Sequence, residues 1–321
     1  MTRISKDISK AVEILKGEDI VAIPTETVYG LAGNIYSEKA ITKIFQLKQR
    51  PLFNPLIVHV HSLAEVEEIV THIPDKAKLL AHAFWPGSLT LILPKKTTVP
   101  HLVTAGKDTV AVRIPKHPVA LELLKRLDFP LAAPSANPFG AISPTQASHV
   151  VNYFTDDLSL ILDGGDCEHG IESTIIGFEN EKPILYRLGS IAMEDITNVI
   201  GEIEVKNKKE TAPNAPGMLS RHYAPNTTTF LVDDVDAFIG DKLDKKIGVL
   251  LFNKKVDNPS LAHQEVLSSS GNLKEATSKL YAALHKLDKM DLDMIVAQRF
   301  PDTGLGKSIN DRLERATKKK L

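Results

Sequence analysis

The stretch IPTETVYGLAGNI, residues 23–35, decides how this chain is expected to fold. It completes the apolar run DIVAI (19–23) and leads to SEKAITKIFQLKQRP (37–51), whose apolar residues recur at helical spacing until a proline ends the pattern. A buried strand, a polar turn and a helix are typical of an α/β sheet, in which ligands bind beyond the carboxyl ends of strands. The two threonines and the glutamate of the turn are therefore the first candidates for a binding site.

Short runs rich in Val, Ile and Leu continue to about residue 205 and are punctuated by Gly or Pro, which predicts an α/β domain over residues 1–205. Beyond residues 19–23, strands are expected at 56–60, 89–93, 109–114, 130–133, 158–162, 173–178 and 183–188.

Two further helices are predicted in this domain. Residues 1–20 form an amphipathic pattern with Ala11, Ile14 and Leu15 on the inner face. The segment 143–154 opens with a capping box of Ser143 and Gln146, with a proline at the first helical position, which predicts a helix start at Ser143.

Residues 206–226 mix a lysine run with several prolines and show no apolar period, which predicts a linker. Residues 227–321 return to alternating strands and helices, which predicts a second, smaller α/β domain. Its strands are expected at 228–232, 246–252 and 292–298, and its helices at 273–287 and 308–320.

Composition limits the classes of function. Lys and Arg number 39 against 40 Asp and Glu, so the formal charge of −1 gives no bulk field toward nucleic acid or membrane. One cysteine among 321 residues excludes an internal disulfide framework and a Cys-rich zinc site. No apolar run approaches the roughly 20 residues of a membrane span, and the first residues lack the apolar core of a signal peptide. A cytoplasmic protein without membrane contact is expected.

Polar loops follow several of the predicted strands. PTET (24–27), PSANP (134–138) and DGGD (163–166) each come directly after an apolar run, and we expect them to converge on one cleft.

A basic cluster follows the helix predicted at 37–51. Lys48, Arg50 and Asn54 lie within seven residues, beside prolines that fix the turn. Such a cluster could hold a polyphosphate. It could equally complement the dipole at the end of the helix, and the residues alone leave both readings open.

The sequence contains little that indicates a metal site or a nucleophilic residue. His59 and His61 share a strand face, but no third ligand pattern accompanies them, so no metal site from protein side chains is predicted. Cys167 has no basic residue or helix start beside it to favour a thiolate, so it is not expected to act as a nucleophile. Arg113 is expected either to face the cleft or to form a structural ion pair.

Nine motifs together carry a resemblance. In order, they are IPTETVYGL, KQRPLFNPL, FWPGSLTLIL, VAVRIP, APSAN, GIESTI and YRLGSI, followed beyond the linker by APGMLSRHYAP and LGKSINDRLERA. This set resembles the threonylcarbamoyl-AMP synthase (YrdC-like) family in its two-domain form. The resemblance implies an α/β fold, with a YrdC-like twisted mixed sheet surrounded by helices and a smaller Rossmann-like C-terminal domain.

The resemblance also implies a reaction. L-Threonine and bicarbonate or CO2 form a carbamate, which attacks the α-phosphate of ATP with Mg2+ present and yields threonylcarbamoyl-AMP and pyrophosphate. A tRNA-threonylcarbamoyl transferase complex then modifies a tRNA adenosine next to the anticodon, and the chain itself could contact tRNA.

The resemblance assigns roles to individual residues of this sequence. Lys48 and Arg50 are implied to be catalytic, while Thr25 and Glu26 are expected only to shape their turn. The implied ATP contacts are Lys48, Arg50, Asn54, Thr109, Ser135, Asn137, Ser143 and Arg187. The implied L-threonine contacts are Thr27, His59, Ala133 and Ser173.

The linker is expected to act as a lid, because a mixed anhydride hydrolyses readily and the site should exclude water during the reaction. The segment 215–225 is rich in specific side chains, Met218, Arg221, His222 and Tyr223, and its prolines lower the cost of ordering it. Simple attachment of the two domains is the alternative.

Two other functions remain under consideration from the sequence. A double-stranded RNA or tRNA-binding module without synthase activity would use the same basic residues on nucleic acid phosphates. A carbamoyl-transferring maturation enzyme that shares the YrdC-like domain would need Cys-pair zinc motifs, which one cysteine cannot supply.

Overall fold

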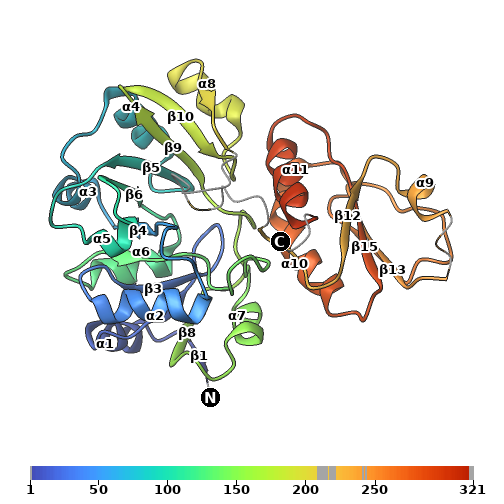
Figure 1. Cartoon of the computed structure of the whole chain (residues 1–321), viewed down its shortest axis with the longest axis horizontal. Coiled ribbons are helices and arrows are strands. Elements are labelled where there is room, and N and C mark those ends of the chain that lie inside the picture. The colour runs from blue at the N-terminus through green and yellow to red at the C-terminus, as the bar shows by residue number, and fades with distance from the viewer. Residues whose placement is uncertain (1, 208–215, 217–221, 241, 243, 318–321) are drawn as a thin grey trace.

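The computed structural model describes residues 2–207, 216, 222–240, 242 and 244–317, and within them the chain builds two β-sheets. The first sheet has eleven strands between residues 3 and 205, and the second has four strands between residues 229 and 298 (Figure 1). The predicted combination of a large mixed α/β fold and a smaller α/β unit is confirmed.

The strands of the first sheet are β1 (Arg3–Ser5), β2 (Val21–Ile23), β3 (Gly30–Asn34), β4 (Ile57–His59), β5 (Leu89–Pro94), β6 (Thr109–Arg113), β7 (Leu131–Ala132), β8 (Leu160–Leu162), β9 (Thr174–Glu179), β10 (Lys182–Arg187) and β11 (Glu204–Val205). Their order is β1-β8-β2-β3-β7-β4-β6-β5-β9-β10-β11. Parallel pairs such as β4–β6 and β5–β9 alternate with antiparallel pairs such as β2–β3 and β9–β10. Along one side of this sheet, some strands therefore begin and others end, so loops that precede strands and loops that follow strands lie next to each other.

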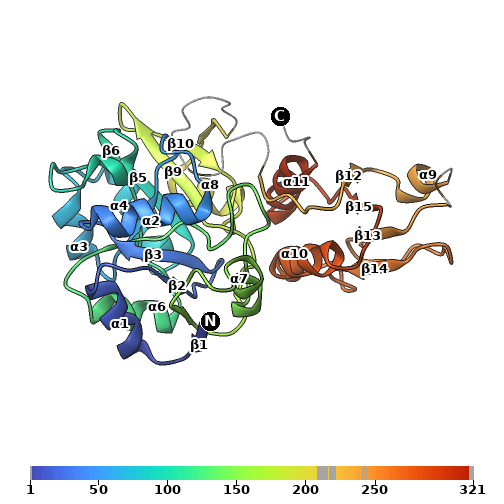
Figure 2. The same ribbon diagram turned by 60° about the horizontal axis from the view of Figure 1, so that its bottom comes forward.

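Helices surround this sheet (Figures 1 and 2). They are α1 (Ile8–Lys16), α2 (Glu38–Lys48), α3 (Leu63–Ile69), α4 (Asp75–Phe84), α5 (His101–Thr104), α6 (Pro118–Lys125), α7 (Ala147–Tyr153) and α8 (Met193–Ile200).

Helix α2 fixes the start of the basic cluster. Ser37 caps it by accepting a hydrogen bond from the Ala40 amide at 3.2 Å, and Gln49 ends it in a left-handed conformation. Because the helix stops there, Arg50 lies beyond the helix and its side chain turns away from the helix axis. The predicted segment 37–51 is thus a helix over all but its ends.

The second sheet is entirely parallel in the order β12-β15-β13-β14, as expected for a Rossmann-like unit. Its elements are β12 (Thr229–Val232), α9 (Val235–Ile239), β13 (Ile247–Leu251), β14 (His263–Val266), α10 (Leu273–Asp288), β15 (Met294–Gln298) and α11 (Leu305–Ala316). Helices α10 and α11 lie between this sheet and the first unit (Figures 1 and 2).

A single apolar cluster crosses between the two units. Val28, Ile142 and Ile171 of the first unit belong to the same buried cluster as Tyr281 and Leu284 of α10. Continuous apolar burial of this kind stabilises the contact between the units, and it extends to the turn that follows β2.

Two sequence predictions were wrong about element starts. Residues 1–20 are not one helix, because residues 3–5 pair with β8 and only Ile8–Lys16 is helical. The helix predicted from Ser143 begins at Ala147, and Gln146 caps it without a side-chain hydrogen bond. Ser143 has a stronger tertiary partner, since its hydroxyl donates to Glu172 at 2.5 Å. Strands β1, β3, β11 and β14 were also missed.

The boundary predicted at residue 205 coincides with the end of β11, the last strand of the first sheet. The linker prediction falls largely on residues outside the described ranges. Among the described residues, no helix is long and apolar enough to cross a membrane.

Gly170 supplies a test of the contact between the units. Its φ is +72°, and a Cβ there would lie 2.3 Å from the Ser278 carbonyl oxygen of α10. We expect Gly170→Ala to lower the free energy of unfolding by roughly 1–3 kcal/mol beyond the cost of the backbone conformation, because α10 must shift. Urea denaturation measures the change.

Gly106→Ala is the matched control. Gly106 has a similar φ of +77° but nothing within 4 Å of an added Cβ, so it reports the backbone cost alone. Equal losses in the two variants would contradict a tight contact at Gly170.

Candidate active site

A cavity of about 50 Å3 opens where the polar turns after β2 and β7 meet the ends of β4, β6 and β10 and the start of β9. Three residues of the linker region, Pro216, His222 and Tyr223, close it. The remaining lining residues are Thr25, Thr27, Val28, Gly30, Arg50, Ile57, His59, Arg113, Ala133, Pro134, Ser135, Glu172, Ser173 and Arg187.

Arg50 lines this cavity and is only 7% exposed. Its Nε donates to the Asn54 carbonyl at 3.1 Å, and Nη2 donates to the Asn54 side-chain oxygen and to the Pro55 carbonyl, both at 2.8 Å. Burial, and then the neighbouring charge of Arg187, lower the pKa of Arg50 to about 9. These bonds use Nε and Nη2, so Nη1 is the nitrogen left for a ligand within the described part of the chain.

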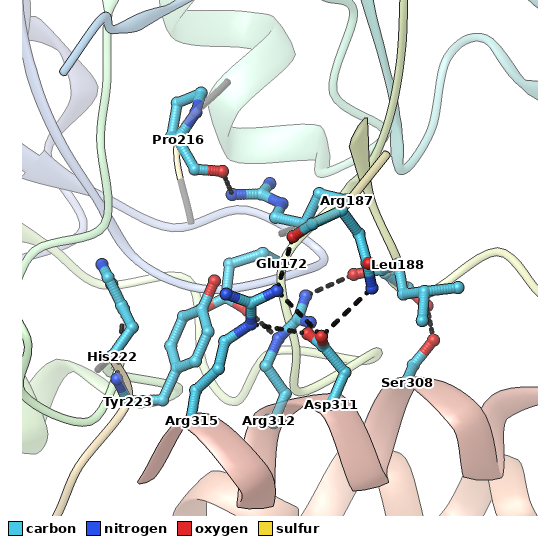
Figure 3. Close-up of polar contacts among 12 residues, drawn as sticks. Glu172, Arg187, Leu188, Pro216, His222, Tyr223, Ser308, Asp311, Arg312 and Arg315 are labelled. Carbon is cyan, nitrogen blue, oxygen red and sulfur yellow. Dashed lines mark hydrogen bonds and ion pairs between the residues drawn. The ribbon is translucent and has the colours of Figure 1, made fainter. Parts of the chain in front are cut away.

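Arg187, at the end of β10, lines the same cavity and is 5% exposed. Nε and Nη2 donate to the Ser173 carbonyl and hydroxyl, both at 3.0 Å. Nη1 donates to the Pro216 carbonyl at 3.3 Å (Figure 3). Burial lowers the pKa of Arg187 as well. Among the described residues, neither Arg50 nor Arg187 has an ion-pair partner, because the carboxylate of the cavity lining, Glu172, is paired with Arg312 instead.

Lys48 does not line the cavity. Its ammonium is 1% exposed and donates to the carbonyls of Ser135 and Asn137, each at 2.5 Å. Burial, and then Arg50, hold the pKa of Lys48 well below its usual value. Lys48 therefore fixes the loop that carries Ser135 into the cavity.

Asn54 and Asn137 also lie behind the lining. Both are fully buried, and the Asn137 side chain donates to the carbonyls of Pro138 and Ala141. Asn54 holds Arg50. Of these predicted ATP contacts, Arg50 and Ser135 thus reach the cavity, whereas Lys48, Asn54 and Asn137 support them.

Glu26 and Arg113 form a buried ion pair at 2.6 Å. Arg113 also donates to the Thr27 hydroxyl at 2.9 Å and to the Gly87 carbonyl at 3.0 Å. Burial opposes ionisation of Glu26, but Arg113 outweighs it, so the pKa of Glu26 lies below its usual value. Glu26 does not line the cavity and holds its turn through the pair with Arg113, whereas Thr25 does line it. Both readings of Arg113 hold, since it is ion-paired and lines the cavity.

The predicted threonine contacts, Thr27, His59, Ala133 and Ser173, all line the cavity. The His59 Nδ1 lies 3.2 Å from the Ile57 carbonyl. Burial, and then Arg113, lower the pKa of His59 to about 3, so the ring is neutral. Because a carbonyl only accepts, Nδ1 carries the proton and Nε2 remains as an acceptor. Thr90 bonds the Ser173 hydroxyl at 2.7 Å and holds it in place.

Besides Lys48, Asn54 and Asn137, two further predicted ATP contacts, Thr109 and Ser143, lie outside the lining. Thr109 starts β6, four residues before Arg113 on the same strand face, which places it roughly 13 Å along the strand. Ser143 is fully buried behind Glu172, so the helix start expected there does not present amides to an anion. The DGGD loop also does not line the cavity. Instead its Gly165 carbonyl accepts from the Tyr29 hydroxyl at 2.8 Å.

Cys167 is buried, and burial raises its pKa, consistent with its expected inertness. Among the described residues, no group of three or more His, Cys, Asp or Glu could hold a metal ion.

His222 and Tyr223 cover the cavity. The Tyr223 ring lies 4.2 Å from that of His222 and 4.8 Å from the guanidinium of Arg312, while its hydroxyl is buried without a partner among the described residues. Tyr223 has a φ of 61°, a strained conformation for a residue with a side chain. Met218 and Arg221, the other residues of the predicted lid, lie outside the described residues.

Glu172 was not predicted. It lines the cavity and accepts hydrogen bonds from Ser143, Tyr281 and Arg312. Its position inside the apolar run GIESTI could have identified Glu172 as a site residue, because an isolated carboxylate among buried residues requires partners.

Breaking the Glu26–Arg113 pair should be costly. We expect Glu26→Gln to lower the free energy of unfolding by about 3–5 kcal/mol at pH 7, because Arg113 is left buried and unpaired. Since the folded pKa of Glu26 lies below its unfolded value of 4.5, this stabilisation is present above pH 4.5 and is lost as pH falls through the folded pKa.

Denaturant curves at several pH values measure this effect. The difference between wild type and Glu26→Gln should shrink below pH 4.5. Asp75→Asn, which breaks the exposed pair with Lys78, should leave stability unchanged. A difference for Glu26→Gln that does not change with pH would contradict the ionised buried pair.

Both parts of this chain are similar to known proteins. Residues 13–189 match the Sua5, YciO and YrdC family described as "Telomere recombination", and residues 191–317 match "Threonylcarbamoyl-AMP synthase, C-terminal domain". Threonylcarbamoyl-AMP synthase of Pyrococcus abyssi is 40% identical over 93% of this chain and 90% of its own length. That of Bacillus subtilis is 39% identical over 96% and 92%.

Solved structures agree. The crystal structure of P. abyssi Sua5 complexed with L-threonine has a TM-score of 0.91 and 37% identity, covering 99% of this chain and 97% of that one. A variant of the same protein, in which an adjacent histidine and tyrosine are changed to alanine, has a TM-score of 0.90 and 37% identity over 99% and 96%. Both domains and their mutual arrangement are thus shared, and the chain belongs to the threonylcarbamoyl-AMP synthase family.

Proposed function

We propose that this chain is an L-threonylcarbamoyladenylate synthase that converts L-threonine, bicarbonate or CO2, and ATP to threonylcarbamoyl-AMP and pyrophosphate. One observation carries the proposal. Arg50 and Arg187 are buried without an ion-pair partner among the described residues, and they face the same cavity as the neutral polar group of Thr27, His59 and Ser173.

The arginine end of the cavity suits the phosphates of ATP. The Arg50 guanidinium can donate to a phosphate oxygen through Nη1, and burial strengthens such charge-assisted bonds. Loss of pyrophosphate moves charge away from the α-phosphorus, so fixed cations stabilise the transition state without covalent catalysis. An apolar strip that includes Ile57 and Ala111 leads from this end toward Thr109, and we propose that the nucleoside lies along it.

The neutral groups of the same cavity suit L-threonine. Thr27, the acceptor nitrogen of His59 and the Ser173 hydroxyl offer neutral hydrogen bonds, Ala133 offers an apolar contact, and Arg113 offers a cation for a carboxylate. The threonine amine adds to CO2 with loss of a proton, and an oxygen of the resulting carbamate attacks the α-phosphorus. Holding both reactants in one cavity replaces a bimolecular encounter.

Mg2+ is proposed to arrive with ATP. Magnesium commonly binds through substrate phosphates and water with only one or two carboxylates. The carboxylate in the cavity lining, Glu172, already accepts three hydrogen bonds. The described residues therefore fit a metal held mainly by the phosphates, which would neutralise charge there.

The product is proposed to pass to a tRNA-threonylcarbamoyl transferase complex in the cytoplasm. The alternative, a module that binds double-stranded RNA or tRNA with the same basic residues, is disfavoured because Lys48, Arg50 and Arg187 are all buried. A duplex surface cannot enter such a cavity, whereas a single nucleotide can.

Substrate selectivity tests the function. Pyrophosphate release should require ATP and threonine. The kcat/KM for serine should be lower by a factor that corresponds to roughly 1–3 kcal/mol, the contribution of one methyl group in a pocket. Valine should do worse, since the hydroxyl partners stay unpaired. Equal turnover of the three amino acids, or release independent of any amino acid, would refute the proposal.

A lid is the second testable part. Pro216, His222 and Tyr223 line this cavity of about 50 Å3, and we propose that they move aside to admit ATP and threonine and then close over them. We expect the double variant His222→Ala with Tyr223→Ala to reduce turnover by roughly ten- to a hundredfold, because reactants are positioned less well and water enters.

Quenched-flow assays that separate pyrophosphate from intact threonylcarbamoyl-AMP measure this. The double variant should also release a larger share of hydrolysed product. Tyr36→Ala with His82→Ala, at two exposed positions, is the control and should behave as wild type. Wild-type yields in the lid variant would mean that this segment only attaches the domains.

A further inference from the structure

A carboxylate lies in the cavity at the place where phosphates are proposed to bind. Glu172 is buried and lines the cavity together with Arg50 and Arg187. An uncompensated negative charge there would repel ATP, and it would also attract the two arginines that the phosphates need. The site therefore works only if another group compensates Glu172.

Three donors from both domains satisfy Glu172. Ser143 donates to Oε1 at 2.5 Å, while Tyr281 and Arg312 donate to Oε2, each at 2.9 Å. Tyr281 belongs to α10 and Arg312 to α11, so the charged partner comes from the C-terminal domain. Figure 3 shows α11 presenting Arg312 to Glu172 beside Arg187.

Arg312 is held rigidly. It is 0% exposed, and its other nitrogens donate to Asp311 at 2.7 Å and to the Leu188 carbonyl at 2.6 Å. Its guanidinium also lies 4.8 Å from the Tyr223 ring. Arg312 thus touches the carboxylate of the cavity, the residue that follows Arg187, and the cover of the cavity.

We propose that Arg312 is a positioning residue for ATP: from the C-terminal domain it neutralises Glu172 and leaves Arg50 and Arg187 available to the phosphates. This inference rests on the ATP site proposed above. It gives the C-terminal domain a definite part in the reaction, because docking of α11 converts a repulsive cavity into one that accepts a polyphosphate.

If α11 moves away from the first domain, Glu172 loses its contact with Arg312. Without Arg312, Glu172 keeps only the neutral donors Ser143 and Tyr281, and Arg187 is the nearest alternative cation. Burial raises the pKa of Glu172, but Arg312, Arg187 and the bond from Ser143 together hold it below its usual value, so both arginines act on this carboxylate. A Glu172–Arg187 pair would occupy the phosphate site from within the protein.

A double-mutant cycle in the full-length protein tests this. Arg312→Met keeps the length of the side chain and removes its charge, and it should raise the KM for ATP by roughly tenfold or more while changing the KM for threonine much less. Combining it with Glu172→Gln should recover most of the loss, since glutamine neither repels phosphate nor captures Arg187. Pyrophosphate release and calorimetric binding of ATP give the two readouts.

The control is Arg299→Met, at an arginine of the same domain whose ion pairs with Asp233 and Glu314 are partly exposed. An unchanged ATP KM in Arg312→Met, or a loss in ATP affinity that Glu172→Gln does not relieve, would overturn the proposal. A wild-type protein that releases no pyrophosphate would instead refute the proposed function, so the two failures are distinguishable.

Thermal unfolding of each variant guards against misfolding. If Arg312→Met does not fold, Arg312→Lys decides the question, because lysine keeps the charge and loses the contacts to Asp311 and Leu188. If Arg312→Lys raises the KM for ATP less than about threefold, the charge of residue 312 is what matters and the proposal is supported. A larger rise shows that the lost contacts matter instead and overturns the proposal.

Discussion

The site depends on burying four arginines in and beside one cavity while leaving two of them without a carboxylate partner. Arg113 is paired with Glu26, and Arg312 with Glu172 and Asp311. Arg50 and Arg187 have only neutral partners among the described residues. A buried cation costs free energy unless it is compensated, so the folded protein stores an affinity for an anion at this point.

The two domains share this arrangement. The first domain supplies the phosphate-facing arginines and the pocket of Thr27, His59 and Ser173, whereas the second supplies Arg312 through α11. Apolar packing between α10 and the turn after β2 brings these groups within hydrogen-bond distance. Residues far apart in the chain therefore meet at Glu172, on the surface where the two domains pack.

Sequence patterns predicted well wherever the physical cause is local. Helix α2 follows from its Ser37 cap, its apolar period and the proline beyond it. The polar turn after β2 and the serine after β7 were located as site residues because they interrupt apolar strands. The helix start at Ser143 was wrong, because a bond to Glu172 from a distant segment outweighs a local cap.

By itself, the sequence predicted the α/β class and two domains, and its resemblance to the family pointed to Arg50, Thr27, His59, Ser135, Ser173 and Arg187, all of which line one cavity. Only the tertiary structure decided that Lys48 and Asn137 support the site from behind, that Glu26 pairs with Arg113, and that Glu172 joins the domains. The reason is that side-chain type and spacing are local properties. Whether a buried charge is free or compensated depends on groups that only the folded chain brings together.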